Sequence, residues 1–128
     1  MKITKEKFYG IPMYECYIDF YSQYFYLFFG KKNLKKFADY VEDDEFEFSA
    51  RCMVFLHEDK KFPRCIYMWF PTREYKIIKQ GILAHECLHL IDWISKGKGF
   101  HHDIENQEVY AQFMGYLFSS LLPFFKKK

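Results

Sequence analysis

Short segments rich in aromatic and β-branched residues recur along the chain between stretches with a helical period. Residues 13–19 and 23–29 hold Tyr, Phe and Ile on either side of a short polar break, which predicts two antiparallel strands. Segments 46–56 and 64–70 have the same composition and are joined by the polar residues 57–61. The pattern therefore predicts two strand pairs.

Three helices are predicted from apolar spacing and capping residues. The first has a stripe at i, i+3, i+4 and i+7 formed by Leu34, Phe37, Ala38 and Val41. A long helix is expected over about 74–95, with Thr72 as its N-cap and Gly97 just after its last turn. A last helix, capped by Asp103, should run to about residue 121. The predicted order is β-β-α-β-β-α-α.

The composition supports one domain over residues 1–128. Half of the 128 residues are hydrophobic and 23% are aromatic, which is ample material for a core and excludes intrinsic disorder. We expect an α+β fold with a small, mostly antiparallel sheet, one covering helix, a buried helix and a C-terminal helix.

Charge and hydropathy argue against two classes of partner. The net charge of +2 gives no electrostatic reason to expect nucleic acid, and the lysines within 31–36 are expected on the solvated face of a helix. The longest apolar run, residues 24–29, is far shorter than the ~20 residues of a membrane span. The first residues lack the pattern of a secretory signal. We therefore expect a cytoplasmic protein that binds neither nucleic acid nor membrane.

The four cysteines contain no Cys-x-x-Cys pair, so a zinc ribbon or a thioredoxin motif is not predicted. Reduced thiols are expected in a cytoplasmic protein. A hairpin centred on residues 58–59 would place Cys52 opposite Cys65, and the sequence leaves open whether these two pair.

The candidate chemistry lies in His85-Glu86-Cys87-Leu88-His89, within the long predicted helix. Residues four apart on a helix project from the same face, so the imidazoles of His85 and His89 can reach one Zn²⁺. Glu86 is turned by ~100° from His85, where it can take a proton from a metal-bound water. The helix is apolar almost all round, so it is expected to be buried. Buried histidines need partners, which a metal ion would provide.

A third ligand has to come from outside this pentapeptide. Glu108 follows His89 by 19 residues, enough for a helix end, a turn and a second helix. Small residues at Ala111 and Gly115 predict a close approach of the two helices on the side of Glu108. Asp92 is expected to accept a hydrogen bond from His89. The alternative third ligands are Glu105, His101, His102 and Asp92.

The pattern His-Glu-x-x-His followed after about twenty residues by Glu108 resembles the zincin metallopeptidases of the glutamate-ligand branch, the gluzincins. Residues 81–89 and 106–117 are also similar to small zincin-like proteins of tailed phages and prophages, and the resemblance extends over roughly 64–118. Gln112 departs from it, because such proteins often carry Tyr there.

This resemblance implies a zincin-like fold, with His85, His89 and Glu108 as zinc ligands and Glu86 as the base. It also implies an edge strand that lines the cleft and pairs with an extended peptide. Strand 65–70 is the candidate, and the alternative is that it is an ordinary interior strand.

The sequence thus predicts a zinc-dependent hydrolase, a metallopeptidase with Glu86 as general base and a peptide or protein as substrate. The alternative is a zinc-stabilised structural or assembly protein, for example of a phage particle, with a closed coordination site. A phage-encoded protein would act in the host cytoplasm or with the virion. The candidates for an oxyanion-stabilising electrophile are Tyr75, His101, His102 and Tyr110. Substrate, cleavage preference and oligomeric state are not predicted.

Overall fold

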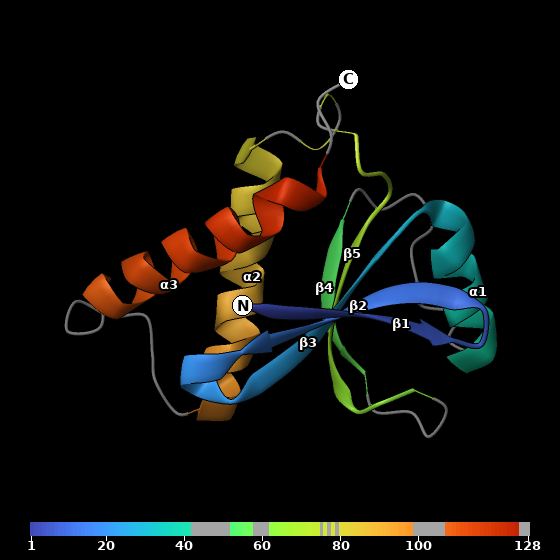
Figure 1. Ribbon diagram of the computed structural model, residues 1–128, viewed down its shortest axis with the longest axis horizontal. Coiled ribbons are helices and arrows are strands. Elements are labelled where there is room, and N and C mark those ends of the chain that lie inside the picture. The colour runs from blue at the N-terminus through green and yellow to red at the C-terminus, as the bar shows by residue number, and fades with distance from the viewer. Residues whose placement is uncertain are drawn as a thin grey trace. The chain divides into compact units, whose positions relative to one another are not determined.

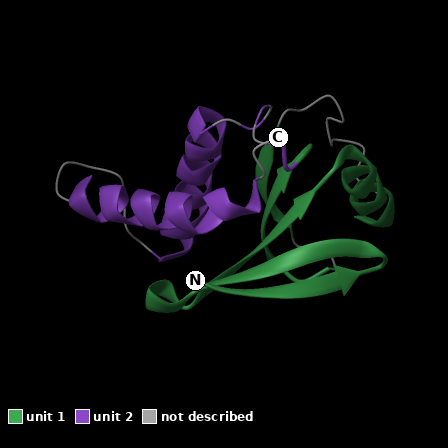
Figure 2. Ribbon diagram, turned by 45° about the horizontal axis from the view of Figure 1, so that its top comes forward, with its two compact units in different colours: residues 1–72 green, residues 73–128 purple. Residues whose placement is uncertain are grey.

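A computed structural model describes residues 1–41, 52–57, 62–74, 76, 78, 80–98 and 107–125 (Figure 1). The chain divides into two compact units, residues 1–72 and 73–128 (Figure 2), and each is described by itself. The architecture is α+β, as the sequence predicts: an open, mostly antiparallel five-stranded sheet and three α-helices. The prediction of one domain over 1–128 stays a prediction.

The first unit is built on the sheet, whose strand order is β1-β2-β3-β5-β4. All neighbours pair antiparallel except β3 and β5, which are parallel. The strands are β1 (Lys2–Phe8), β2 (Ile11–Ile18), β3 (Gln23–Phe29), β4 (Met53–His57) and β5 (Cys65–Phe70). A short 3₁₀ helix, η1 (Asp19–Tyr21), links β2 to β3.

Helix α1 (Lys31–Val41) lies on one face of this sheet, and its predicted stripe faces the core. Leu34 and Phe37 are fully buried there, and the ring of Phe37 lies 4.5 Å from that of Phe62 and 5.3 Å from that of Tyr67. The core cluster of this face is Ile11, Met13, Tyr26, Phe28, Leu34, Phe37, Phe62, Tyr67 and Trp69. The lysines of α1 are exposed, as predicted.

The start of α1 is tied to β5 through Gly30. Its φ of +92° is in the left-handed region, which glycine adopts without strain. Its N–H donates to the carbonyl of Phe70 at 2.9 Å, and its carbonyl accepts from Leu34 N–H at 3.1 Å and Trp69 Nε1 at 2.8 Å. These bonds fix the point at which β3 turns into the helix.

Three predictions about the first unit are corrected. Strand β1 was not predicted, because it is an exposed edge strand with four charged residues and hardly any apolar pattern. Strand β5 lies between β3 and β4, so the interior-strand alternative is right and the edge-strand prediction is wrong. The register pairs His57 with Cys65, not Cys52 with Cys65, and none of the four cysteines forms a disulfide. The predicted strand residues 46–51 and turn residues 58–61 lie outside the described residues.

The second unit contains helices α2 (Gln80–Lys98) and α3 (Gln107–Leu121), followed by the 3₁₀ helix η2 (Leu122–Phe124). Helix α2 begins six residues later than predicted, so Thr72 is not its N-cap, and it continues through Gly97 to Lys98. An exposed glycine such as Gly97 lowers the stability of a helix by only about 1 kcal/mol relative to alanine, which is too little to end the helix. The predicted cap at Asp103 lies outside the described residues.

Helices α2 and α3 are joined by a buried hydrogen bond that no pattern in the sequence predicts. The hydroxyl of Tyr110 donates to Ser95 Oγ at 2.9 Å, and Ser95 Oγ donates in turn to the carbonyl of Asp92 at 3.0 Å. Its one sequence signal is a lone serine among the apolar residues of α2. Arg73 also fixes the end of this unit, since its Nε donates to the carbonyl of Phe124 at 2.8 Å.

Candidate metal centre

The two histidines of the candidate site lie one turn apart in the middle of α2, and their rings converge. His85 Nε2 and His89 Nε2 are 3.1 Å apart, with ring planes inclined by 76°. Both side chains are exposed. The helical spacing that predicted a shared direction for these two imidazoles is therefore confirmed.

This separation fits two ligands of one zinc ion. At zinc–nitrogen distances of ~2.0–2.1 Å and tetrahedral angles, two ligand nitrogens lie about 3.4 Å apart. The observed 3.1 Å is within a few tenths of an ångström of that value. The pair thus needs little movement of either side chain to chelate a metal ion.

The exposure of both histidines contradicts the prediction that this helix is buried on all sides. Helix α2 is not buried all round, because His85 and His89 share an exposed sector with Ile82 and Leu88, both 37% exposed. The opposite sector carries the buried residues Leu83, Glu86, Cys87, Leu90, Ile91, Ile94 and Ser95. Water can solvate exposed histidines, so burial does not demand a metal there. The feature that favours a metal ion is the convergence of the two ring nitrogens.

Glu86 differs from the histidines that flank it in sequence, because its side chain is only 8% exposed. Burial raises the pKa of this carboxyl, and the nearby charges of His89 and His85 oppose that rise. A carboxylate with a raised pKa beside an exposed histidine pair has the character of a general base.

Glu108, the predicted third ligand, is exposed at the start of α3 and accepts a hydrogen bond from Gln112 Nε2 at 3.3 Å. Among the described residues, no three His, Cys, Asp or Glu side chains form a group that could hold a metal ion. The structure thus brings His85 and His89 together but does not bring Glu108 to them. The alternatives Glu105, His101 and His102 lie outside the described residues.

The orientation of α3 explains the position of Glu108. The buried side of this helix is formed by Tyr110, Phe113, Leu117 and Leu121. At 100° per residue, Glu108 lies opposite that stripe. Ala111 and Gly115 are exposed, and a β-carbon built on Gly115 meets nothing within 4 Å. The prediction that these small residues lie at a close helix contact is wrong, since burying large side chains removes more apolar surface from water.

Two of the auxiliary predictions can be located. Tyr110 is buried and bonded to Ser95, so it serves the contact between the helices, whereas Tyr75 lies outside the described residues. Asp92 is half-buried one turn after His89, and its predicted side-chain contact to that ring stays a prediction.

In comparisons with known proteins, no family model, curated protein or solved structure matches this chain. The candidate centre therefore stands on its own residues. No helix in the described part of the chain is both long and apolar enough to cross a membrane.

Proposed function

We propose that this chain is a zinc-dependent hydrolase, a metallopeptidase in which His85 and His89 bind the metal and Glu86 acts as general base. The observation that carries the proposal is the 3.1 Å separation of the two Nε2 atoms on one exposed helix face, next to a largely buried glutamate. The resemblance of this motif to gluzincins is part of the proposal and agrees with that geometry.

The donor set suits zinc. Imidazole nitrogens at i and i+4, with a carboxylate from another segment, form the ligand set of many catalytic zinc sites. Zinc, when bound, supplies a Lewis acid that polarises a carbonyl group and makes water more acidic. Both histidine side chains are exposed, so a metal ion held by them would be accessible to solvent and to a substrate.

Glu86 acts as general base and then as general acid in this proposal. Its carboxylate accepts the proton of the attacking water and passes it to the leaving amine, so the water becomes nucleophilic and the amine leaves uncharged. Glu86 shares the buried side of α2 with Leu83, Cys87 and Leu90, so its side chain has less freedom than an exposed glutamate. A side chain with restricted freedom reorganises less when the proton is transferred.

Glu108 is the third ligand in this proposal, and Glu105 is the alternative. For Glu108 to reach the histidine pair, its carboxylate would have to leave Gln112 and α3 would have to turn about its axis, breaking the bond between Tyr110 and Ser95. Such a rearrangement costs free energy that metal binding would have to offset. The choice between the two glutamates is therefore a direct experimental question.

The test is a paired measurement of zinc content and hydrolysis of an unstructured protein such as casein. Glu86→Gln should keep one zinc per chain and lose at least 100-fold in rate, and His85→Ala should lose both zinc and hydrolysis. Glu6→Gln is the matched control, because it makes the same change on β1 and should alter neither quantity. If Glu86→Gln cleaves as fast as the parent, Glu86 is not the base. If the parent binds zinc but cleaves nothing, the structural alternative is correct.

A second pair of variants addresses the third ligand. Glu108→Gln should weaken zinc binding by 10-fold or more, while Glu105→Gln should leave it unchanged. The reverse result would assign the ligand to Glu105 and would leave the histidine pair and Glu86 in their roles.

A further inference from the structure

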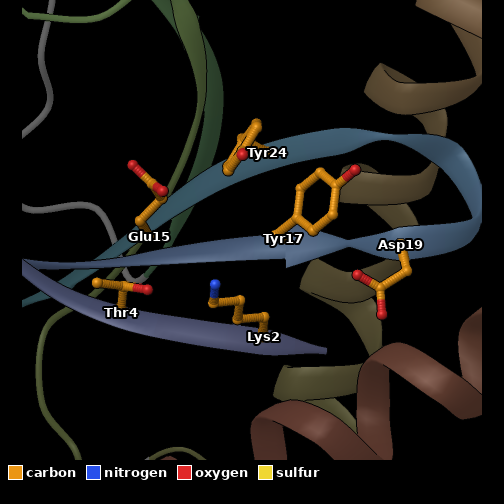
Figure 3. A pocket seen from close by; sticks show the side chains of 6 residues that line it. All are labelled: Lys2, Thr4, Glu15, Tyr17, Asp19 and Tyr24. Atoms are coloured by element: carbon orange, nitrogen blue, oxygen red, sulfur yellow. The ribbon is translucent and has the colours of Figure 1, made fainter.

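A hollow of about 400 Å³ opens on the sheet of the first unit (Figure 3). Its lining residues lie within residues 2–24, and none of them belongs to the candidate metal centre. The hollow lies on the same face of the sheet as α1, because its β2 residues Glu15 and Tyr17 point to the same side of the strand as the core residue Met13. Its volume is within the usual range of small-molecule sites, which starts near 300 Å³. The lining residues are Lys2, Thr4, Glu15, Tyr17, Asp19 and Tyr24.

The register explains why these side chains gather. Lys2 lies opposite Tyr17, and Tyr17 opposite Tyr24, so the three form one row across β1, β2 and β3. Thr4 and Glu15 are partners in the next row on the same face. Asp19 follows β2 directly and adds a second carboxylate to the lining, at the opposite end from Glu15 (Figure 3).

Both signs of charge therefore line one small space. Lys2 supplies an ammonium group, and Glu15 and Asp19 supply carboxylates. Across the described segments, the structure gives neither Lys2 nor Asp19 an ion pair. These charges are free to meet the opposite charges of a ligand. Two carboxylates disfavour a simple anion, and Lys2 disfavours a simple cation, so the complementary ligand carries both charges.

The tyrosines add an apolar wall. The rings of Tyr17 and Tyr24 are in contact, with centroids 4.6 Å apart and planes inclined by 40°, and Tyr24 is 46% exposed. A ring pair of this kind can pack against an aromatic or aliphatic group. The ligand should therefore have an apolar part beside its charges.

Two hydrogen bonds hold the lining in place before any ligand arrives. Tyr26 donates its hydroxyl proton to Glu15 Oε2 at 2.9 Å, and the Cys65 thiol donates to the carbonyl of Tyr24 at 3.0 Å. Burial, together with the bond to Glu15, raises the pKa of Tyr26, so its hydroxyl stays a donor at neutral pH. A fixed lining loses less conformational entropy on binding.

We propose that this hollow binds a free α-amino acid with an apolar side chain. The ligand carboxylate pairs with Lys2, its ammonium group pairs with Glu15, and its side chain packs on Tyr17 and Tyr24, while Asp19 adds negative charge at the other end of the lining. A peptide terminus offers only one of the two charges, so the free amino acid is the better match. The inference is independent of the proposed hydrolase, because none of its residues belongs to α2 or α3.

The test is an NMR titration of the ¹⁵N-labelled full chain with phenylalanine, phenylalaninamide and N-acetylphenylalanine. Phenylalanine should bind saturably with a dissociation constant in the millimolar range and shift the amides of Lys2, Thr4, Tyr17 and Tyr24. The amide lacks the carboxylate and the acetyl derivative lacks the ammonium group, so each should bind at least 5-fold more weakly. If either derivative binds as well as phenylalanine, or if no saturation occurs by 20 mM, the proposal is wrong.

Two variants assign the charges. Lys2→Met should weaken phenylalanine binding at least 5-fold and abolish the preference over the amide. Lys5→Met is the matched control, since Lys5 is an exposed lysine of the same strand that pairs with Tyr14 and faces the other side of the sheet. It should leave binding unchanged. Equal binding by both variants and the parent would contradict the assigned role of Lys2.

Discussion

Replacing Tyr110 with phenylalanine should destabilise the second unit by the net value of one buried hydrogen bond. The hydroxyl of Tyr110 is 2.9 Å from Ser95 Oγ, and the two residues are 5% and 4% exposed. Ser95 keeps its own bond to the carbonyl of Asp92, so its donor stays satisfied in the variant. The loss is therefore that of one neutral bond, about 1 kcal/mol in the free energy of unfolding. In a chain of this length that lowers the melting temperature by roughly 4 °C.

Urea denaturation followed by circular dichroism measures this loss, and a double-mutant cycle isolates it. Tyr110→Phe and Ser95→Ala should each destabilise the protein, and the double variant should fall short of their sum by about 1 kcal/mol. Tyr24→Phe is the control, because its side chain is 46% exposed, and it should unfold like the parent. Strictly additive single effects would show that Tyr110 does not face Ser95. The orientation of α3 that turns Glu108 away from the histidines would then be wrong.

Three other predictions concern the first unit and the thiols. Trp69→Phe should lower the free energy of unfolding by about 2 kcal/mol, because Trp69 is fully buried and its Nε1 donates a hydrogen bond to the carbonyl of Gly30. Urea denaturation measures this loss, and an unchanged free energy of unfolding would contradict the packing of Trp69. Gly30→Ala should lower the free energy of unfolding by about 1–2 kcal/mol, because alanine is strained at the φ of +92°. The added β-carbon makes no clash, since its nearest neighbour is Asn33 at 3.8 Å. An unchanged free energy of unfolding in the same assay would refute this prediction. Burial raises the pKa of the Cys16 thiol to about 12, so the stability that the buried neutral thiol contributes is present below pH 9 and is lost as the pH rises toward 12. Cys16→Ala should therefore show a shallower fall in stability between pH 9 and 11, and equal slopes would oppose this assignment.

The elements with strong local patterns were the predictable part of the fold. Strands β2 and β3 are nearly where their aromatic composition predicts them, and α1 buries Leu34, Phe37 and Ala38 as its spacing requires. Strand β1 escaped prediction because an edge strand exposes most of its side chains. The parallel pairing of β3 with β5 joins segments about forty residues apart, and no local pattern specifies it.

The candidate site also has one part that local sequence patterns predict and another that they do not. The approach of His85 to His89 follows from helical geometry within one turn, so the sequence alone is sufficient to predict it. The position of Glu108 depends on which side of α3 is buried, which is decided by competition between whole stripes of side chains. The buried side is formed by Tyr110 and its apolar neighbours, not by the small residues Ala111 and Gly115 that the spacing predicts there. The link between Tyr110 and Ser95 is tertiary and has no spacing signature.

The central claim is that His85 and His89 hold one zinc ion together. Its most direct test is zinc titration of the metal-free protein by isothermal calorimetry, with His89→Ala and Lys96→Ala measured beside the parent. The parent and Lys96→Ala, a change two turns further along the same helix, should bind one zinc per chain, and His89→Ala should lose at least 100-fold in affinity. An affinity for zinc that is the same in His89→Ala and in the parent, or no zinc binding by the parent, would contradict the claim.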